Sequence, residues 1–527
     1  MTSLLSEATV SRHRIRVVGV VQGVGFRPYV YRLANEAGLV GHVCNDDQGV
    51  LIEVEGPPAA LACFESRLVD EAPALSRING VETCARPPLG ETTFRVLESG
   101  AGGGGRTFIS PDVATCEACR RELFDPDDRR YRYPFTNCTD CGPRFTITER
   151  LPYDRANTTM RGFTLCAKCE EEYHDPSDRR FHAQPVACAR CGPRLWFEDR
   201  QGRVEGTDAA LAHAQEALAE GLIVGIKGLG GYHLACDATT PGPLEALRHR
   251  KGRPHKAFAV MVADVAHAEG LGEIGEAERA LLSSRERPIV LLRRRRDAPL
   301  ARGVAPDNPY VGVMLPYTPL HHLLFATTPG SSVPAPGALV MTSGNLSDEP
   351  ICYDDAEARA RLGRIVDGWL AHDRPIHVPC DDSVVCAESG RELPIRRSRG
   401  YAPLPVSLAF EVPPLLATGG ELKNTFCLAQ GTNAWMSQHI GDMGSVETMA
   451  AFARSVEQFR EVYGIEPELV AADAHPGYRI RRWAEEHGAV VELVQHHHGH
   501  VAAVMAEHRV APEGRVIGVA FDGTGYG

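Results

Sequence analysis

The sequence predicts a multidomain protein built from α/β and α+β units, and three observations lead to this fold class. With 527 residues, the chain is too long for a single hydrophobic core. A cysteine-rich duplication occupies most of its second hundred residues. On both sides of that duplication, short apolar runs that suit strands alternate with amphipathic runs that suit helices. Several domains are therefore expected, and the cysteine-rich segment is one of them.

The charge and the N-terminus limit the partners that we expect. The formal net charge is −12, so the chain has no general attraction to nucleic acid. The first residues, MTSLLSEATVSRHR, lack the regions of a signal peptide, and no apolar run reaches membrane-spanning length. Many CxxC thiols without a secretory signal are typical of a reducing compartment. We therefore expect a cytoplasmic protein with neither a membrane nor a nucleic-acid partner.

Residues 12–98 are predicted to form the first domain, with a ferredoxin-like fold. A strand at 13–22 leads into a Gly-rich turn, and Pro28 suits the first turn of a helix that runs to about Ala37. The resulting order, βαββαβ, is typical of that fold. The remaining elements are expected as strands at 39–45 and 50–55, a helix at 58–70 and a strand at 93–97.

The turn at 23–27 carries the chemistry of this domain. Glycines let backbone N–H groups face an anion, the helix N-terminus adds a positive dipole, and Arg27 supplies a planar guanidinium for phosphate. This turn, VQGVGFRPYV, followed by Asn45 at a strand end, resembles acylphosphatase. The resemblance implies two catalytic residues. Arg27 would grip an acyl phosphate, and Asn45 would orient the attacking water.

Eight cysteines in four CxxC pairs form an internal duplication. The inner gap is eighteen residues in both halves, and the second half follows the first by fifty residues. Two CxxC pairs close a structural four-cysteine zinc site, so two zinc ions are expected. Sequential and crossed pairing of the CxxC motifs both remain open. The ligands are Cys116, Cys119, Cys138, Cys141, Cys166, Cys169, Cys188 and Cys191.

The duplication is predicted to be a structural spacer. Residues 101–200 hold sixteen basic and sixteen acidic residues, which argues against the nucleic-acid binding common among zinc fingers. Closed sites also leave no open position for catalysis. The module is expected at 107–200, after a flexible Gly-rich linker at 99–106. Its repeated Asp-Pro, Arg-Arg and Gly-Pro-Arg elements are interpreted mostly as turns and solvated charge.

Residues 205–403 are predicted to form a mixed α/β domain whose strand ends repeatedly carry Lys, Arg, Ser and Asn. This pattern favours an anionic nucleotide pocket, with cations for the phosphates. The motifs resemble the YrdC-like domain of threonylcarbamoyl-adenylate synthases. The resemblance implies ATP, with magnesium, as a substrate that adenylates a carbamate-type carboxylate. The residues that it assigns to the nucleotide or carbamate are Lys227, Arg253, Lys256, Ser343, Asn345 and Arg399.

Residues 412–527, after a Pro-rich joint, are predicted to form a truncated domain of the actin-like ATPase fold. His496 and His500 share a helix face and suit one metal ion, either iron or zinc. An expected strand, VIGVAF, ends at Asp522 before a Gly-rich loop. This resembles the threonylcarbamoyl-transferase fold, which implies Asp522 as a third ligand and Gly523 and Gly525 near phosphate. About half of such a fold is present, so a fragment that fails at the final transfer is expected.

The order of the four units resembles the HypF family of hydrogenase maturation carbamoyltransferases. The resemblance implies that carbamoyl phosphate is hydrolysed to carbamate, that ATP converts carbamate to carbamoyl-AMP, and that the carbamoyl group passes to the C-terminal Cys of a partner maturation protein, HypE, for cyanide ligand synthesis. Two alternatives are a tRNA threonylcarbamoylation-type enzyme or RNA-binding protein, and a non-catalytic zinc scaffold. The negative net charge argues against the RNA-related alternative. The Gly-rich turn at 23–27, which suits phosphate binding, argues against both alternatives.

Overall fold

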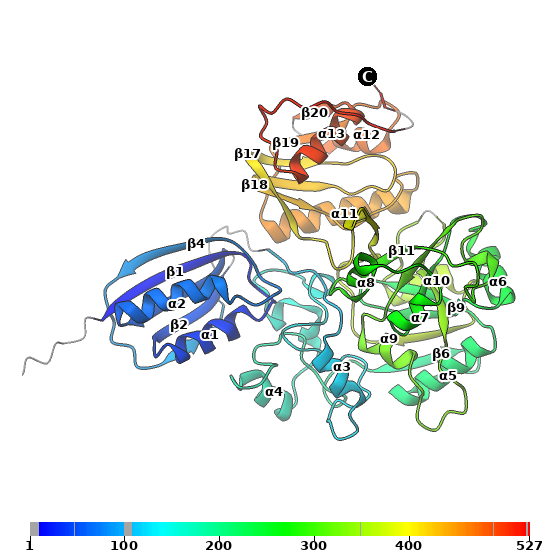
Figure 1. Cartoon of the computed structure of the whole chain (residues 1–527), viewed down its shortest axis with the longest axis horizontal. Coiled ribbons are helices and arrows are strands. Elements are labelled where there is room, and N and C mark those ends of the chain that lie inside the picture. Colours follow the sequence, from blue (N-terminus) through cyan, green and yellow to red (C-terminus); the bar gives the residue numbers. More distant parts are fainter. Residues whose placement is uncertain are drawn as a thin grey trace, which may run out of the picture.

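A computed structural model describes residues 10–46, 48–99, 108–347, 349–487, 490–522 and 525–526. Four units follow one another along the chain (Figure 1). The first lies at the left of the figure, the cysteine-rich module at the centre, a large sheet unit at the right and the C-terminal unit above. The mixed α/β and α+β class predicted from the sequence is confirmed. The linker expected at 99–106 lies outside the described residues, except for Ser99.

The first unit is a five-stranded sheet covered by two helices. Its strand order is β4-β1-β3-β2-β5, in which β2 and β5 are parallel and the other pairs are antiparallel. Helices α1 and α2 pack against each other and against the sheet. Its elements are β1 (Ser11–Val20), α1 (Phe26–Glu36), β2 (Val40–Asp46), β3 (Gly49–Gly56), α2 (Pro58–Asp70), β4 (Arg77–Arg86) and β5 (Phe94–Val96).

Strand β4 is an element that the sequence interpretation lacks. None of its side chains is buried, so it has no apolar alternation to mark it. It pairs with β1 along its length at the edge of the sheet, and its partly buried Ile78 packs against the core.

The cysteine-rich module has little regular secondary structure. Its two α-helices, α3 (Glu117–Phe124) and α4 (Ala167–His174), begin directly after the first cysteine of each repeat. Three short 3₁₀ helices lie between them, at Phe145–Ile147, Arg155–Asn157 and Thr159–Gly162. A module this small buries little apolar surface, so metal sites and buried ion pairs are needed to stabilise its fold.

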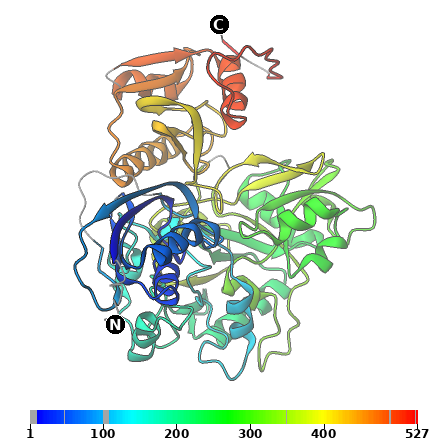
Figure 2. The same ribbon diagram turned by 60° about the vertical axis from the view of Figure 1, so that its left-hand side comes forward.

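This module lies among the other three units (Figures 1 and 2). Tyr31 of the first unit packs edge-on against Phe181, with ring centroids 5.5 Å apart. Phe145 packs against Phe459 of the C-terminal unit, with centroids 6.1 Å apart. Its last residues run directly into strand β6 of the large sheet. The module therefore contacts each of the other three units, while its role as a spacer stays a prediction.

The third unit is built on a mixed sheet of eleven strands, ordered β16-β15-β11-β12-β10-β13-β9-β8-β14-β6-β7. Apolar clusters cover both faces of this sheet. Its strands are β6 (Leu195–Asp199), β7 (Arg203–Glu205), β8 (Val224–Lys227), β9 (Tyr232–Asp237), β10 (Ala259–Val262), β11 (Ile289–Arg293), β12 (Tyr310–Met314), β13 (Ala338–Ser343), β14 (Gly368–His372), β15 (Val384–Glu388) and β16 (Arg391–Arg396).

Six helices flank this sheet. They are α5 (Thr207–Ala219), α6 (Pro241–Lys251), α7 (Val265–Glu269), α8 (Glu276–Ser283), α9 (Pro319–Leu324) and α10 (Asp355–Leu362), with a 3₁₀ turn at Arg302–Val304. Strand β6 pairs with β14, so the sheet starts before the boundary expected at residue 205. The last residues assigned to the spacer belong to this sheet, because Leu195, Trp196 and Phe197 are buried in it.

The C-terminal unit has a four-stranded sheet, ordered β18-β17-β19-β20. Most of the Pro-rich joint expected from 403 to 414 is part of β17, and the prolines at its end fall where the register with β18 shifts. The elements are β17 (Pro405–Ala417), β18 (Cys427–Met436), α11 (Val446–Tyr463), β19 (Leu469–Asp473), α12 (Arg479–His487), β20 (Val491–Val494) and α13 (His496–Glu507).

The strand expected at 516–521 does not form. Among the described residues, this segment pairs with no strand, and Ile517 and Phe521 are 97% and 98% exposed. A β-prone sequence needs a neighbouring strand to become a strand. No described helix of the chain is both long and apolar enough to cross a lipid bilayer.

Candidate functional sites

The first site lies in the turn between β1 and α1. Gly23 and Gly25 have φ angles of 70° and 74°, a left-handed backbone that glycine adopts without strain. Arg27 follows at the start of α1 and is 7% exposed. With the Asn45 amide oxygen turned toward it, Arg27 donates to Asn45 from Nε at 3.1 Å and from Nη2 at 3.3 Å. The structure therefore brings together the two residues predicted to be catalytic.

The cysteine-rich module covers this turn. Arg27 Nη2 donates to Asp154 Oδ1 at 2.9 Å. The Tyr153 backbone N–H donates to Gln22 Oε1 at 3.0 Å, and Arg144 Nε donates to the Gly23 carbonyl at 2.5 Å. The contacts of Tyr153 and Asp154 could not be predicted, because both residues lie in a segment that the duplication does not repeat.

A small cavity remains between the turn and its cover. Arg27, Asn45, Arg144, Tyr153 and His182 all line it. Burial and the nearby Arg27 charge lower the pKa of His182 to about 3, so this ring is neutral near pH 7. Arginine therefore supplies the positive charge of this cavity.

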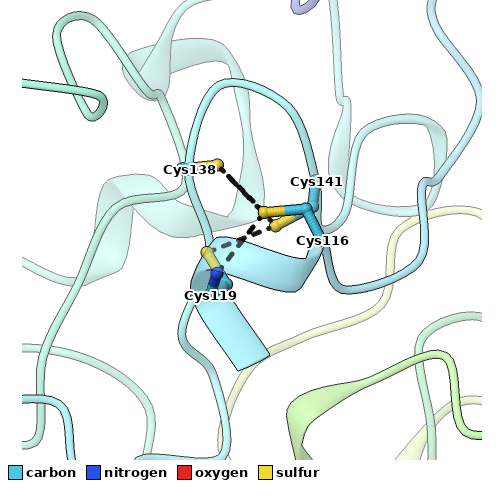
Figure 3. A group of neighbouring side chains, drawn as sticks. All are labelled: Cys116, Cys119, Cys138 and Cys141. Atoms are coloured by element: carbon cyan, nitrogen blue, oxygen red, sulfur yellow. Dashed lines mark hydrogen bonds between the residues drawn. The ribbon is translucent and has the colours of Figure 1, made fainter. Parts of the chain in front are cut away.

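The eight cysteines form two separate clusters. The first contains Cys116, Cys119, Cys138 and Cys141, and Figure 3 shows their sulfur atoms converging on one point. Neighbouring sulfurs are 3.7, 3.9 and 3.5 Å apart. Tetrahedral zinc with Zn–S bonds of about 2.3 Å requires sulfurs about 3.8 Å apart. The chemistry and spacing of these donors therefore fit zinc.

The second cluster repeats this geometry with Cys166, Cys169, Cys188 and Cys191. Its sulfur separations are 3.7, 3.8 and 3.6 Å. The CxxC motifs therefore pair sequentially, which settles the alternative that the sequence left open.

Arginines of the first repeat contact the cysteine cluster of the second. Arg129 Nη2 donates to Cys169 Sγ at 3.1 Å, and Arg129 Nε donates to Glu172 at 2.8 Å. Arg130, whose side chain is 1% exposed, also pairs with Glu172 and donates to the Ala187 carbonyl at 2.9 Å.

The second repeat returns the same contacts to the first. Arg179 donates to Cys119 Sγ from both terminal nitrogens, at 3.2 and 3.1 Å. Arg179 and Arg180 pair with Glu122, and Arg180 Nε donates to the Asn137 carbonyl at 3.2 Å. The Arg-Arg elements were predicted to be mostly solvated, and this was wrong. Each pair instead compensates the thiolate charge of the other repeat.

A cavity of about 260 Å³ lies between the third and the C-terminal units. Four of the residues predicted to bind nucleotide line it: Arg253, Lys256, Ser343 and Asn345. Lys423, His439 and Asp442 line it from the opposite unit. Burial lowers the pKa of His439 to about 4. The cavity thus combines cations with hydroxyl and amide groups, as an anionic ligand requires.

Lys251 is a residue of this site that the sequence interpretation missed. Its Nζ donates to the Ser343 carbonyl at 2.8 Å, and to the Asn345 carbonyl and Oδ1 at 2.6 and 2.5 Å. It thereby fixes the turn after β13. Burial lowers the pKa of Lys251 to about 7. The sequence places Lys251 two residues before Arg253, in the same basic run, but nothing in that run distinguishes its side chain from its neighbours.

Lys227 and Arg399 lie apart from this cavity. Lys227 is 2% exposed, forms an ion pair with Asp355 at 2.6 Å, and has a pKa lowered by burial. Arg399 pairs with Asp382 at 2.7 Å, and its guanidinium lies 3.5 Å from the centre of the Tyr317 ring. The structure therefore does not place Lys227 and Arg399 in the cavity that Arg253 lines, and their contact with a nucleotide stays a prediction. The positive charges of Lys227 and Arg399 are each paired with a carboxylate of the protein itself.

The third group of donor atoms lies at the start of α13. The Nε2 atoms of His496 and His500 are 3.2 Å apart, and Asp522 lies 2.7 and 3.3 Å from them. Asp473, at the end of β19, accepts a 2.5 Å hydrogen bond from His496 Nδ1. This contact directs the Nε2 lone pair toward the group, as metal-bound histidines require. Asp473 was not predicted.

The Gly-rich loop is only partly described. Gly523 lies outside the described residues. Gly525 packs against the His497 ring, where an added Cβ would come within 2.4 Å of the ring. The Gly419-Gly420 turn between β17 and β18 also approaches this group, since a Cβ on Gly420 would lie 3.7 Å from His496.

Family models match all four units. A model described as "Acylphosphatase" matches residues 13–96, and one described as "HypF finger" matches 115–148 and 165–198. The Sua5/YciO/YrdC model, described as "Telomere recombination", matches 216–398. The "HypF Kae1-like domain" matches 411–507.

Curated relatives and a solved structure resemble nearly the whole chain. The chain is 51% identical to "Carbamoyltransferase HypF2" of Cupriavidus necator, over 98% of the chain and 66% of the relative. It is 49% identical to "Carbamoyltransferase HypF" of Synechocystis sp., over 97% and 66%. A crystal structure of full-length HypF, described as phosphate- and nucleotide-bound, has a TM-score of 0.93 and 44% identity, over 98% of the chain and 67% of that structure.

The fold and these sites define a multidomain zinc-finger protein that joins an acylphosphatase unit to a Sua5/YrdC-type unit and a Kae1-like unit. The chain belongs to the HypF carbamoyltransferase family. It spans 66% of the length of the two curated relatives.

Proposed function

We propose that the chain converts carbamoyl phosphate and ATP to carbamoyl-AMP in hydrogenase maturation. The observation that carries this proposal is that Arg27 and Asn45 share a chain, and a central finger module, with the cavity of Arg253, Ser343 and Asn345. Membership of a family whose curated relatives are named carbamoyltransferases supports it.

In the first step, water attacks the phosphorus of carbamoyl phosphate. The new P–O bond forms as the bond to the carbamoyl oxygen breaks, so phosphate and carbamate leave. Arg27 and the glycine-turn N–H groups stabilise the charge on the phosphoryl oxygens, and Asn45 orients the water. The buried, partly enclosed position of Arg27 strengthens this electrostatic stabilisation.

In the second step, a carbamate oxygen attacks the α-phosphorus of ATP, and pyrophosphate leaves. Arg253 and Lys256 bind the phosphates, while Lys251 holds the Ser343–Asn345 turn that contacts the carbamoyl group. Carbamate decomposes rapidly in water, so one chain that holds both sites limits its loss.

The final transfer would use the C-terminal unit. His496, His500 and Asp522 would hold an iron or zinc ion there, which would supply a positive charge beside a bound nucleotide. The acceptor is the C-terminal Cys of HypE, whose thiolate attacks the carbamoyl carbon and releases AMP.

Exchange of labelled pyrophosphate into ATP tests this function. Exchange by the chain should depend on carbamoyl phosphate, because only an adenylated acyl group allows the reverse reaction. Exchange that instead requires threonine and bicarbonate would favour the threonylcarbamoylation alternative. Absence of exchange with every donor would favour a zinc scaffold.

A further inference from the structure

We propose that Asp154 of the finger module is a positioning residue that neutralises Arg27 until phosphate replaces it. The inference rests on the proposed role of Arg27 in acyl phosphate binding. Asp154 Oδ1 accepts from Arg27 Nη2 at 2.9 Å, and the two side chains are 25% and 8% exposed. An arginine as buried as Arg27 requires a negatively charged partner. Asp154 is such a partner, and it belongs to the finger module and not to the first unit.

The contact is fixed by the module around it. Tyr153, the preceding residue, bonds to Gln22, whose Nε2 also donates to the carbonyls of Asp46 and Gly49 at 2.7 and 2.9 Å. Gln22 therefore ties the cover to the turn. The Asp154 carboxylate is therefore placed over Arg27 by the neighbouring Tyr153–Gln22 contact as well as by the ion pair.

Substrate and Asp154 compete for the same cation. Arg27 Nε and Nη2 face Asn45, Nη2 also faces Asp154, and Nη1 lies 3.4 Å from Ser99 Oγ. A phosphate gripped by two parallel N–H groups must displace one of these partners. Asp154 is the anionic one, so repulsion from the phosphate makes it the partner that leaves.

The surrounding charge favours this exchange. The Arg144 guanidinium is 1% exposed and donates to the carbonyls of Gly23, Cys138, Thr139, Cys141 and Pro143, which carry no net charge. Its positive charge therefore remains effective in the cavity. When phosphate enters and Asp154 withdraws, Arg27 faces the anion and the Arg144 charge still lies beside the cavity.

Phosphate binding to an Asp154→Asn chain tests the inference. The amide keeps the shape of the side chain but removes the competing charge, so the Kd for inorganic phosphate, measured by calorimetry, should fall about tenfold. The KM for carbamoyl phosphate should fall in parallel, with kcat changed less than KM. Asp154→Ser should behave alike, and Asp154→Glu should stay within about threefold of the unmodified chain.

Controls separate this result from general effects. Asp127→Asn removes an exposed carboxylate of the same module and should leave the Kd unchanged. Each variant should retain two zinc ions per chain, which reports an intact module. A Kd that is unchanged or weaker in both Asp154→Asn and Asp154→Ser would overturn the inference, since Asp154 would then only support Arg27.

The proposed function and the inference fail differently. If the unmodified chain binds phosphate through Arg27 but releases none from carbamoyl phosphate, the function fails and the Kd comparison still tests Asp154. If the chain hydrolyses carbamoyl phosphate and both variants bind phosphate no tighter, the inference fails alone.

Discussion

Replacing Arg27 with alanine is expected to lower phosphate release from carbamoyl phosphate by about 10²–10³-fold. Arg27 is the cation that lies between the glycine turn and Asn45. Its charge meets the phosphoryl oxygens in a partly closed cavity, where water screens little. Release of inorganic phosphate under saturating carbamoyl phosphate measures the effect on kcat.

Arg32→Ala is the matched control for this experiment. Arg32 lies on the same helix, α1, but is exposed, so its loss should change the rate by less than about twofold. An Arg27→Ala chain that keeps its zinc and more than half of its activity would show that hydrolysis occurs elsewhere.

Replacing both Arg129 and Arg130 with alanine is expected to weaken zinc binding at the other repeat. Four thiolates around one Zn²⁺ carry a net charge of −2, and these arginines place positive charge on Cys169 and Glu172. Loss of such outer contacts costs about 10–100-fold in metal affinity. Zinc should therefore leave the Cys166–Cys191 cluster faster, although the substitutions lie in the first repeat.

The duplication supplies both the reciprocal test and a control. Arg179→Ala with Arg180→Ala should loosen the Cys116–Cys141 cluster instead. Arg120→Ala with Arg121→Ala removes two exposed arginines of α3 and should have little effect. A chromogenic chelator reports zinc release but does not show which cluster lost its ion. Variants in which Cys→Ser substitutions remove one cluster leave a single zinc site, so the release measured in each variant belongs to the remaining cluster. If the arginine substitutions instead speed zinc release from the cluster of their own repeat, the arginines do not act on the opposite repeat as proposed.

The spacing of the cysteines predicted both four-sulfur clusters, because ligand spacing is local information. The role of the arginines could not be predicted in this way. Arg130 and Arg180 are charged residues in polar surroundings, which usually indicates solvent exposure. Their burial arises from partners in the opposite repeat, and no pattern within one repeat shows that the repeats exchange contacts.

The same limit applies to the nucleotide cavity. Ser343 and Asn345 follow a clear apolar strand, so their position at a strand end was predictable. Arg399 also follows a strand, but Asp382 and the Tyr317 ring hold it. The sequence does not mark Lys251 as buried, because this residue ends a basic helix, where an exposed side chain is the usual outcome. Which cation faces a cavity depends on tertiary packing.

The account predicts that the site of Arg27 feeds carbamate to the adenylating site, and exchange in the Arg27→Ala chain tests this most directly. With carbamoyl phosphate, labelled pyrophosphate should enter ATP in the unmodified chain and not in Arg27→Ala. When concentrated ammonium carbamate is supplied instead, the variant should recover exchange, because its nucleotide cavity is intact. Exchange by Arg27→Ala that still depends on carbamoyl phosphate, or that carbamate fails to restore, would contradict the account.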